Sequence, residues 1–251
     1  MKVSVLSSGS KGNTTYIETD NAKILIDIGN TSKYVKEKLE DFGVKPEELD
    51  AILITHTHID HVKGLKVFKK KYNVPVYITD IMFNSLDYLD DYVLLNDEFD
   101  IKDIHVNSIK TSHDTDDSRG YILSSNGSSI VYVTDTGYIN KKYFDILSNR
   151  DLYILESNHD VELLSNGRYP FQLRQRILSD KGHLSNYDSS KYLSLFIGDK
   201  TKYILLAHLS EENNTEELAY ETLVNRLSVD NKHIDNIIIL KQDKETELIT
   251  I

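Results

Sequence analysis

The stretch AILITHTHIDH at residues 51–61 decides the fold of this chain. It begins as a continuous apolar run, which is typical of a strand covered on both faces, and ends in three histidines and one aspartate. Side chains alternate along an extended segment, so His56 and His58 point the same way and can bind one metal ion. A helix follows, and Asp60 and His61 at its start can reach a second metal. A surface loop could carry the same residues, but four ionisable groups crowded beside a buried strand would be costly without a metal.

The composition indicates an ordinary globular protein that folds as a single domain over residues 1–251. Hydrophobic residues make up 39% and charged residues 27%, and the chain has no cysteine. Disulfides and thiolate zinc sites are therefore excluded, so any metal must take nitrogen and oxygen ligands. No apolar stretch approaches the roughly 20 residues that cross a bilayer, and the first residues lack a signal-peptide core. We expect a cytoplasmic protein with no membrane partner.

The net charge of −11 argues against nucleic-acid binding through a generally basic surface. Residues 166–185 depart from this pattern, because they carry four cations against the single acid Asp180. The cations are Arg168, Arg174, Arg176 and Lys181. Such a run is compatible with a solvated helix face. Its place just before His183 favours contacts with phosphate groups, which arginine side chains can bind bidentately.

The distribution of apolar residues predicts a mixed α/β architecture. Short apolar runs predict strands at residues 2–6, 23–28, 51–54, 128–133, 152–155, 203–207 and 236–240. Apolar positions three and four apart predict helices at residues 31–42, 62–72, 139–148, 186–197 and 215–227. Two of the runs, residues 51–54 and 236–240, are continuously apolar and suit strands covered on both faces. We therefore expect packed sheets with helices on their outer faces.

The His-x-His-x-Asp-His motif, an upstream Asp27 and further His and Asp residues downstream resemble the metallo-β-lactamase superfamily over nearly the whole chain. The resemblance implies a four-layer αββα sandwich and two divalent metal ions. It also implies that His113 completes the first metal site, that Asp135 bridges the metals and that His208 completes the second site. Each of these three follows a strand-like run, where a lone residue taken singly is more typical of a turn or a cap than of a metal ligand.

Asp27 is open to two interpretations. It is either a turn residue before Gly29 or an outer acceptor that fixes the tautomer of a ligating imidazole. The resemblance favours the second. Within the cluster itself, Asp60 would both bind the second metal and orient the attacking water.

Three later motifs resemble the nuclease branch of the superfamily, which includes ribonuclease Z. They are LESNHD at 155–160, GHLS at 182–185 and AHLS at 207–210. In that branch, Glu156 and His183 correspond to an acid pair near the leaving group. Longer segments resemble the YycJ/WalJ family of Gram-positive bacteria: SSGSKGN at 7–13, QRILSDKGHLSN at 175–186 and AHLSEENN at 207–214.

The resemblance to the YycJ/WalJ family implies a metal-dependent phosphodiesterase that acts as a 5′ to 3′ DNA exonuclease in DNA repair. Two metals would supply the attacking hydroxide. Residues 62–112 are expected to hold only about two helices and two strands, which leaves no room for the inserts of RNA-processing relatives. DNA is therefore the expected substrate rather than RNA.

The expected substrate contacts are drawn from the loops around the motifs. They are Ser8, Asn13, Arg174, Arg176, Lys181 and His159, the last without a defined role, while Tyr169 and Phe171 could stack on a base. Loop 7–13 fits an anion site and a plain hairpin loop equally well. The ligand types favour zinc and also suit manganese or iron.

Two other functions remain compatible with the sequence. One is a thioester or lactone hydrolase with the same ligands, because the fold alone does not settle the substrate. The other is a metal-binding regulatory protein, although that reading predicts damaged ligands and all seven expected ligand positions are filled.

Overall fold

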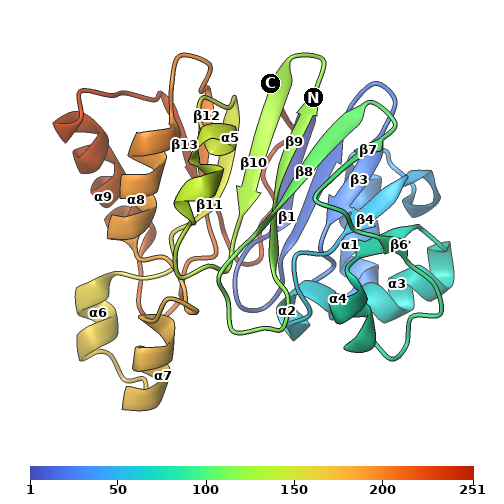
Figure 1. Cartoon of the computed structure of the whole chain (residues 1–251), viewed down its shortest axis with the longest axis horizontal. Coiled ribbons are helices and arrows are strands. Elements are labelled where there is room, and N and C mark those ends of the chain that lie inside the picture. Colours follow the sequence, from blue (N-terminus) through green and yellow to red (C-terminus); the bar gives the residue numbers. More distant parts are fainter.

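The computed structural model describes residues 1–251, which form two seven-stranded sheets packed face to face with helices outside them (Figure 1). This arrangement confirms the expected α/β, four-layer αββα sandwich. None of the helices has the length and apolar character needed to cross a membrane.

The strands and helices of the first half run as follows. The first sheet contains β1 (Lys2–Ser7), β2 (Thr14–Glu18), β3 (Lys23–Ile26), β4 (Ala51–Leu53), β5 (Val76–Ile78), β6 (Val93–Leu94) and the C-terminal β14 (Ile249–Thr250). Its helices are α1 (Ser32–Asp41), the 3₁₀ turn η1 (Pro46–Glu48), α2 (Ile59–Val62), α3 (Leu65–Tyr72) and α4 (Asp80–Asn84).

The second sheet contains β7 (Glu98–Ile101), β8 (Ile104–Lys110), β9 (Arg119–Ser125), β10 (Ser128–Val133), β11 (Leu152–Glu156), β12 (Tyr203–Ala207) and β13 (Asn236–Ile239). Its helices are the 3₁₀ turn η2 (Lys141–Tyr143), α5 (Phe144–Leu147), α6 (Val161–Asn166), α7 (Phe171–Ile177), α8 (Asn186–Phe196) and α9 (Glu216–Val229).

The parallel strands determine where the functional loops meet. The sheet orders are β14-β1-β2-β3-β4-β5-β6 and β13-β12-β11-β10-β9-β8-β7, with β3 to β6 parallel in the first and β10 to β13 parallel in the second. The last residues of β10, β11 and β12 lie in register, because Val133 pairs with Leu155 and Leu155 with Leu206. Loops that leave the carboxyl ends of parallel strands gather at one edge of a sheet, where open α/β folds bind ligands.

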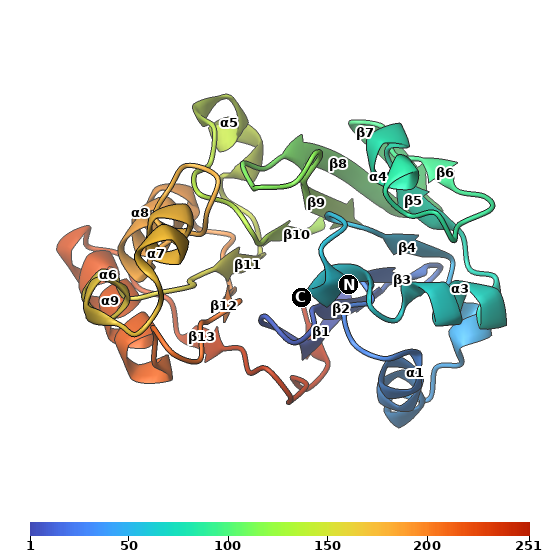
Figure 2. The same cartoon turned by 90° about the horizontal axis from the view of Figure 1, so that it is seen from below.

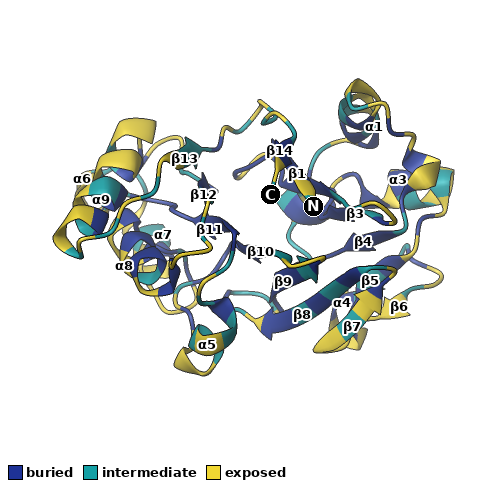
Figure 3. Ribbon diagram, turned by 90° about the horizontal axis from the view of Figure 1, so that it is seen from above, coloured by how far each residue is buried: buried dark blue, intermediate teal, exposed yellow.

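Apolar side chains fill the space between the sheets and beneath the outer helices. Ile26 and Leu53 of the first sheet pack in one cluster with Tyr121 and Ile154 of the second. One further cluster lies between the first sheet and its helices, and another lies between the second sheet and its helices. Figure 3 shows the strands mostly buried and the outer faces of the helices exposed. The two sheets therefore form a firm base for the loops at their edge.

Several segments differ from the sequence expectation. Residues 62–112 hold four strands, β5 to β8, rather than about two; β8 was missed because its apolar residues alternate with polar ones such as Asn107. The predicted helix at 139–148 is the short η2 followed by the single turn of α5. Strand β13 is partly exposed rather than covered on both faces, because it lies at the edge of its sheet.

Candidate metal-dependent active site

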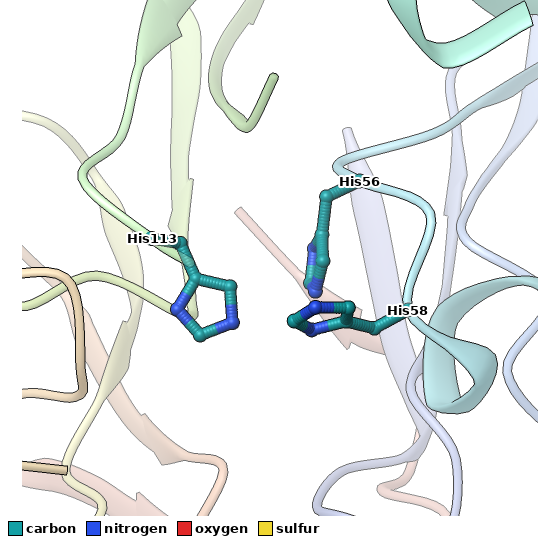
Figure 4. A group of neighbouring side chains, drawn as sticks. All are labelled: His56, His58 and His113. Carbon is teal, nitrogen blue, oxygen red and sulfur yellow. The ribbon is translucent and has the colours of Figure 1, made fainter. Parts of the chain in front are cut away.

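The first metal position lies between the two sheets at their common edge. His56 and His58 come from the loop between β4 and α2, and His113 comes from the loop after β8. One nitrogen of each ring lies within 4.8 Å of the others. Figure 4 shows the His113 ring facing the rings of His56 and His58 across a common point. Three imidazoles converging in this way match the ligand set of a zinc-type site.

The second metal position adjoins the first. Donor atoms of Asp60, His61 and His208 lie within 4.8 Å of one another. Asp135 lies between the two positions, since its Oδ2 is 3.2 Å from His61 Nε2 and its Oδ1 is 3.9 Å from His113 Nε2. The structure thus brings together all seven residues expected as metal ligands, and gives Asp135 the location of a bridging carboxylate.

Neighbouring groups fix which nitrogen each ring turns toward the centre. His61 Nδ1 lies 2.7 Å from Asp27 Oδ2, and His113 Nδ1 lies 3.2 Å from the Gly182 carbonyl. His56 Nδ1 is 3.1 Å from the Thr55 hydroxyl. With Nδ1 occupied, each ring turns Nε2 toward the centre, which is how outer acceptors orient metal-ligating histidines.

The structure supports metal binding through atoms that the protein itself leaves unpaired. His56 Nε2, His208 Nε2 and Asp135 Oδ2 are buried and have no hydrogen-bond partner. Buried polar atoms are nearly always hydrogen-bonded, so three unpaired buried nitrogen and oxygen atoms in one cluster need another partner. Divalent metal ions fit these nitrogen and oxygen donors.

The charges of the buried Asp135 and His208 also indicate metal binding. Burial opposes ionisation of Asp135, but the positive charges of His208 and His61 hold its pKa well below its ordinary value. Burial likewise disfavours protonated His208, yet Asp135, Asp60 and Glu156 raise its pKa to about 10. The buried carboxylates therefore need positive charge beside them. Metal ions can supply that charge and displace the imidazole protons.

Asp27 is fully buried and connects the loop after β3 to the cluster. Its carboxylate accepts hydrogen bonds from the Thr55 amide and hydroxyl as well as facing His61. Burial raises the pKa of Asp27, and the charge of His61 only partly offsets this. The geometry fits the outer-acceptor interpretation of Asp27.

Gly29 lies two residues after Asp27. A Cβ at Gly29 would lie 1.7 Å from the Asp60 carbonyl oxygen, so only glycine allows this close approach.

Three candidate site residues lie one or two residues after a strand and have a left-handed backbone. They are Asp27 after β3, Asp135 after β10 and His208 after β12, with φ angles of 61°, 53° and 56°. The turn that each makes directs its side chain to the sheet edge.

Buried Glu156 and partly exposed His183 form a pair beside the cluster. His183 Nδ1 lies 2.6 Å from Glu156 Oε1, while Glu156 Oε2 accepts hydrogen bonds from the amides of Thr136 and Leu184. Burial would raise the pKa of Glu156, but His183 and His208 lower it to about 2. Glu156 in turn raises the pKa of His183 against the effect of burial. All of these contacts occupy the carboxylate, so Glu156 orients imidazoles and is not free to bind metal.

A cleft of about 350 Å³ opens on His183 of this pair, while Glu156 is fully buried. His113, His183 and His208 line its inner end, and Tyr169, Leu173 and Arg176 line the side formed by α7. Arg176 forms an ion pair with Asp114, the residue after His113. Figure 2 shows α7 standing beside the edge where the metal-site loops gather. Arg176 and Tyr169 are therefore the expected substrate residues that the structure places at the site.

Other expected substrate residues lie elsewhere. The Ser8 hydroxyl accepts a hydrogen bond from the His208 amide, and the buried Asn13 Nδ2 lies 3.3 Å from Asp60 Oδ2, so both contact residues of the metal-binding cluster. The Arg174 guanidinium donates to the Ser165 carbonyl and joins α7 to α6. Lys181 is exposed and does not line the cleft. Within loop 7–13, the Asn13 side chain bonds the Gly9 backbone and Lys11 pairs with Glu211, while exposed Ser10 lines the cleft.

A buried amide network, which the sequence analysis missed, joins the loops behind the pair. We define it as Ser157, Asn158, Asn186 and Asn214. Asn214 Nδ2 donates to the carbonyls of Ser157 and Asn158 and to Asn186 Oδ1, and Asn158 Nδ2 donates to the His208 carbonyl. These residues lie within the LESNHD, GHLSN and AHLSEENN segments, and that clustering was the available sign of their role.

His159 follows the network and is 1% exposed, with neither ring nitrogen hydrogen-bonded. Its backbone pairs with Ser185 at the start of α8. Burial lowers the pKa of His159 to about 4. His159 does not line the cleft, in contrast with the substrate contact expected from the sequence.

The family is decided by a direct match. Residues 8–208 match the model of the metallo-beta-lactamase superfamily. The chain belongs to this superfamily. It is 41% identical to exodeoxyribonuclease WalJ of Streptococcus pneumoniae over 90% of this chain and 88% of that protein. It is 39% identical to exodeoxyribonuclease YycJ of Bacillus anthracis over 86% and 85% of the two chains.

Among solved structures, the short form of human tRNase Z superposes over 100% of both chains with a TM-score of 0.66 and 16% identity. This likeness concerns the fold alone. The relatives agree with the expected resemblance to the YycJ/WalJ family and with a metal-dependent hydrolase, typically dinuclear in this superfamily.

Proposed function

We propose that this protein is a metal-dependent DNA exonuclease that hydrolyses phosphodiesters from the 5′ end. The observation that carries the proposal is the Glu156–His183 pair, in which the buried Glu156 holds His183 at the lining of the cleft beside the metal-binding cluster. Thioester or lactone hydrolysis has less need of a proton donor for a poor leaving group. The 39–41% identity to exodeoxyribonucleases over most of the chain supports the same conclusion.

Two divalent ions, which we propose to be zinc with manganese or iron as alternatives, would bind to the seven ligands. When bound, they neutralise phosphate charge and lower the pKa of water, so that a nucleophile exists at neutral pH. Asp60 then orients the attacking water from the side of the second position. The ligands of the first position are His56, His58 and His113; those of the second are Asp60, His61 and His208, with Asp135 between them.

His183 is proposed to protonate the departing sugar oxygen. Glu156 holds Nδ1 of His183, which leaves Nε2 for the substrate, and keeps the ring charged. Arg176 is proposed to exchange Asp114 for a substrate phosphate, and Tyr169 to stack on a base.

The test is digestion of end-labelled duplex DNA by protein loaded separately with Zn²⁺, Mn²⁺ or Fe²⁺, beside a thioester and lactone panel. We expect mononucleotides released progressively from the 5′ end. Cleavage of thioesters or lactones alone would overturn the proposal. The variant His183→Ala should lose DNA cleavage and keep its metal content; metal loss in this variant would mean that His183 is a ligand.

A further inference from the structure

A second charged surface lies outside the catalytic cleft, on the outer face of the second sheet. A cavity of about 710 Å³ between α5 and α8 is lined by Tyr138, Phe144 and Tyr192 together with Lys141 and Lys191. Figures 1 and 2 show these two helices beside each other on that face. A smaller hollow of about 220 Å³ adjoins it and shares Tyr138 and Asn140. Together they form one continuous groove.

The charge of this groove is opposite to the net charge of the whole protein. Its lining contains four lysines and no carboxylate, in a chain of net charge −11. The lysines are Lys110, Lys141, Lys142 and Lys191, which we call the lysine track. All four are exposed, and none forms an ion pair. Asp145 on α5 and Asp188 on α8 are acids of the two helices that flank the groove, and both lie outside the lining. The track is therefore free to attract a polyanion.

Aromatic side chains give the groove a fixed floor. The Tyr192 hydroxyl accepts a hydrogen bond from the Ile139 amide, and the Tyr143 hydroxyl accepts one from the Lys110 amide. Phe144 packs edge-on against Tyr192. Tyr138 is 40% exposed, which leaves much of its ring open to a stacking partner. Lysines interleaved with tyrosines are the features that bind single-stranded nucleic acid without sequence preference.

The groove also reaches the catalytic loops. Its smaller hollow includes Thr111 and Ser112, which immediately precede the metal-site residue His113. Tyr138 lies three residues after Asp135, and the Thr136 hydroxyl donates to the Tyr138 carbonyl. A strand that leaves the metal centre past these loops would enter the groove directly. Continuity with the site favours nucleic acid over an acidic peptide as the occupant.

We propose that the lysine track and Tyr138 bind a single-stranded DNA segment continuous with the strand in the active site. This inference rests on the proposed nuclease function. The track would hold the substrate by its backbone and bases at a distance from the cut, and so should matter for long strands and not for short ones.

The test measures DNA binding by fluorescence anisotropy, in metal-loaded protein carrying His183→Ala to prevent cleavage. In that background, the pair Lys141→Gln and Lys191→Gln should weaken binding of a 20-nucleotide single strand roughly 10-fold at 0.1 M salt. The slope of log affinity against log salt should fall by about 0.7 per lysine. Binding of a four-nucleotide strand should not change. The matched control, Lys70→Gln with Lys200→Gln, removes two exposed lysines without ion pairs elsewhere on the protein and should have no effect.

Tyr138 offers a second comparison. Tyr138→Ala should weaken binding of the long strand by roughly 5- to 100-fold, whereas Tyr138→Phe keeps the ring and should bind normally. Equal losses for the track variant and its control, or for short and long strands, would overturn the proposal. So would unchanged DNA binding together with lysine-dependent binding of an acidic peptide.

Failure of the track and failure of the proposed function give different results. If wild-type protein cleaves DNA and the track variants bind it normally, only the track is wrong. If wild-type protein does not cleave DNA but binds it through the lysines, only the nuclease function is wrong.

Discussion

The first sheet supplies four metal-site residues from one short segment, the loop after β4 and the start of α2, whereas the second sheet supplies His113, Asp135 and His208 from three loops far apart in sequence. The first loop has its geometry set locally by a strand end and a helix start. In the second sheet, Glu156 and the buried amide network hold the loops of Asp135 and His208, and the Gly182 carbonyl holds the His113 ring. Damage to a single support should therefore spread further in the second half of the molecule than in the first.

The strongest contrast is expected between Asp135 and His58. Asp135→Ala removes the carboxylate between the two metal positions, so it should lower bound metal at both and reduce DNA cleavage to background. His58→Ala should lower the amount of bound metal at the first position alone. Metal analysis by mass spectrometry checks both variants. Two retained metals in Asp135→Ala would contradict the bridging role.

The next contrast separates a proton donor from its support. His183→Ala should reduce the cleavage rate by about 10²- to 10⁴-fold with both metals retained. Glu156→Gln should reduce the rate and also weaken the second metal, since Glu156 Oε1 lies 3.1 Å from His208 Nδ1 as well. Titration with a metal chelator measures the second effect. Unchanged metal affinity in Glu156→Gln would show that its contact with His208 is dispensable.

His159 should make the stability of the second half sensitive to acid. Burial lowers its folded-state pKa to about 4, below the ordinary 6.5, so the unfolded chain binds more protons between these values. Stability should therefore fall by about 3 kcal/mol as pH drops from 6.5 to 4. His159→Leu should remove this part of the pH dependence, measured by urea unfolding across that range. Parallel curves for variant and wild type would contradict the prediction.

Asp27 tests whether the first half also needs an outer support. Asp27→Asn should weaken the second metal by about 10- to 100-fold, because His61 loses the acceptor that orients it. The first metal should keep its affinity. Competition with a chromogenic chelator distinguishes the two sites, and equal weakening of both would mean that the loop moves as a whole.

The smallest effect is expected in the amide network. Asn214→Ala removes five hydrogen bonds from a buried side chain, three donated by Nδ2 and two accepted by Oδ1, and should cost about 1–3 kcal/mol. A chain of this size should then melt about 2–10 °C lower. Exposed Asn21→Ala serves as the control. An unchanged melting temperature in Asn214→Ala would mean that the three loops do not depend on this amide.

The same contrast explains what the sequence could predict. The residues of His56 to His61 share one stretch, so alternation along a strand and a following helix were enough to infer a metal site. The downstream ligands needed family resemblance, because nothing local distinguishes Asp135 from a turn residue. Helices α6 and α7 were missed, and both are short, at six and seven residues.

Side-chain roles in the loops required the tertiary structure. Arg174 and Arg176 look alike in sequence, yet one binds the Ser165 carbonyl while the other lines the cleft. Ser8 seemed available for an anion, but its hydroxyl is occupied by the His208 amide. Such partners lie up to 200 residues away, and residue spacing carries no information about them.

The left-handed backbone at Asp135 and His208 limits how this metal centre could evolve. Aspartate, asparagine and histidine tolerate that conformation better than other non-glycine residues, so glutamate or cysteine there would offer a donor at a conformational cost. His56, His58 and His113 lie outside the left-handed region and carry no such restriction. Selection for a different metal should therefore exchange ligands at the first position and leave Asp135 and His208 in place.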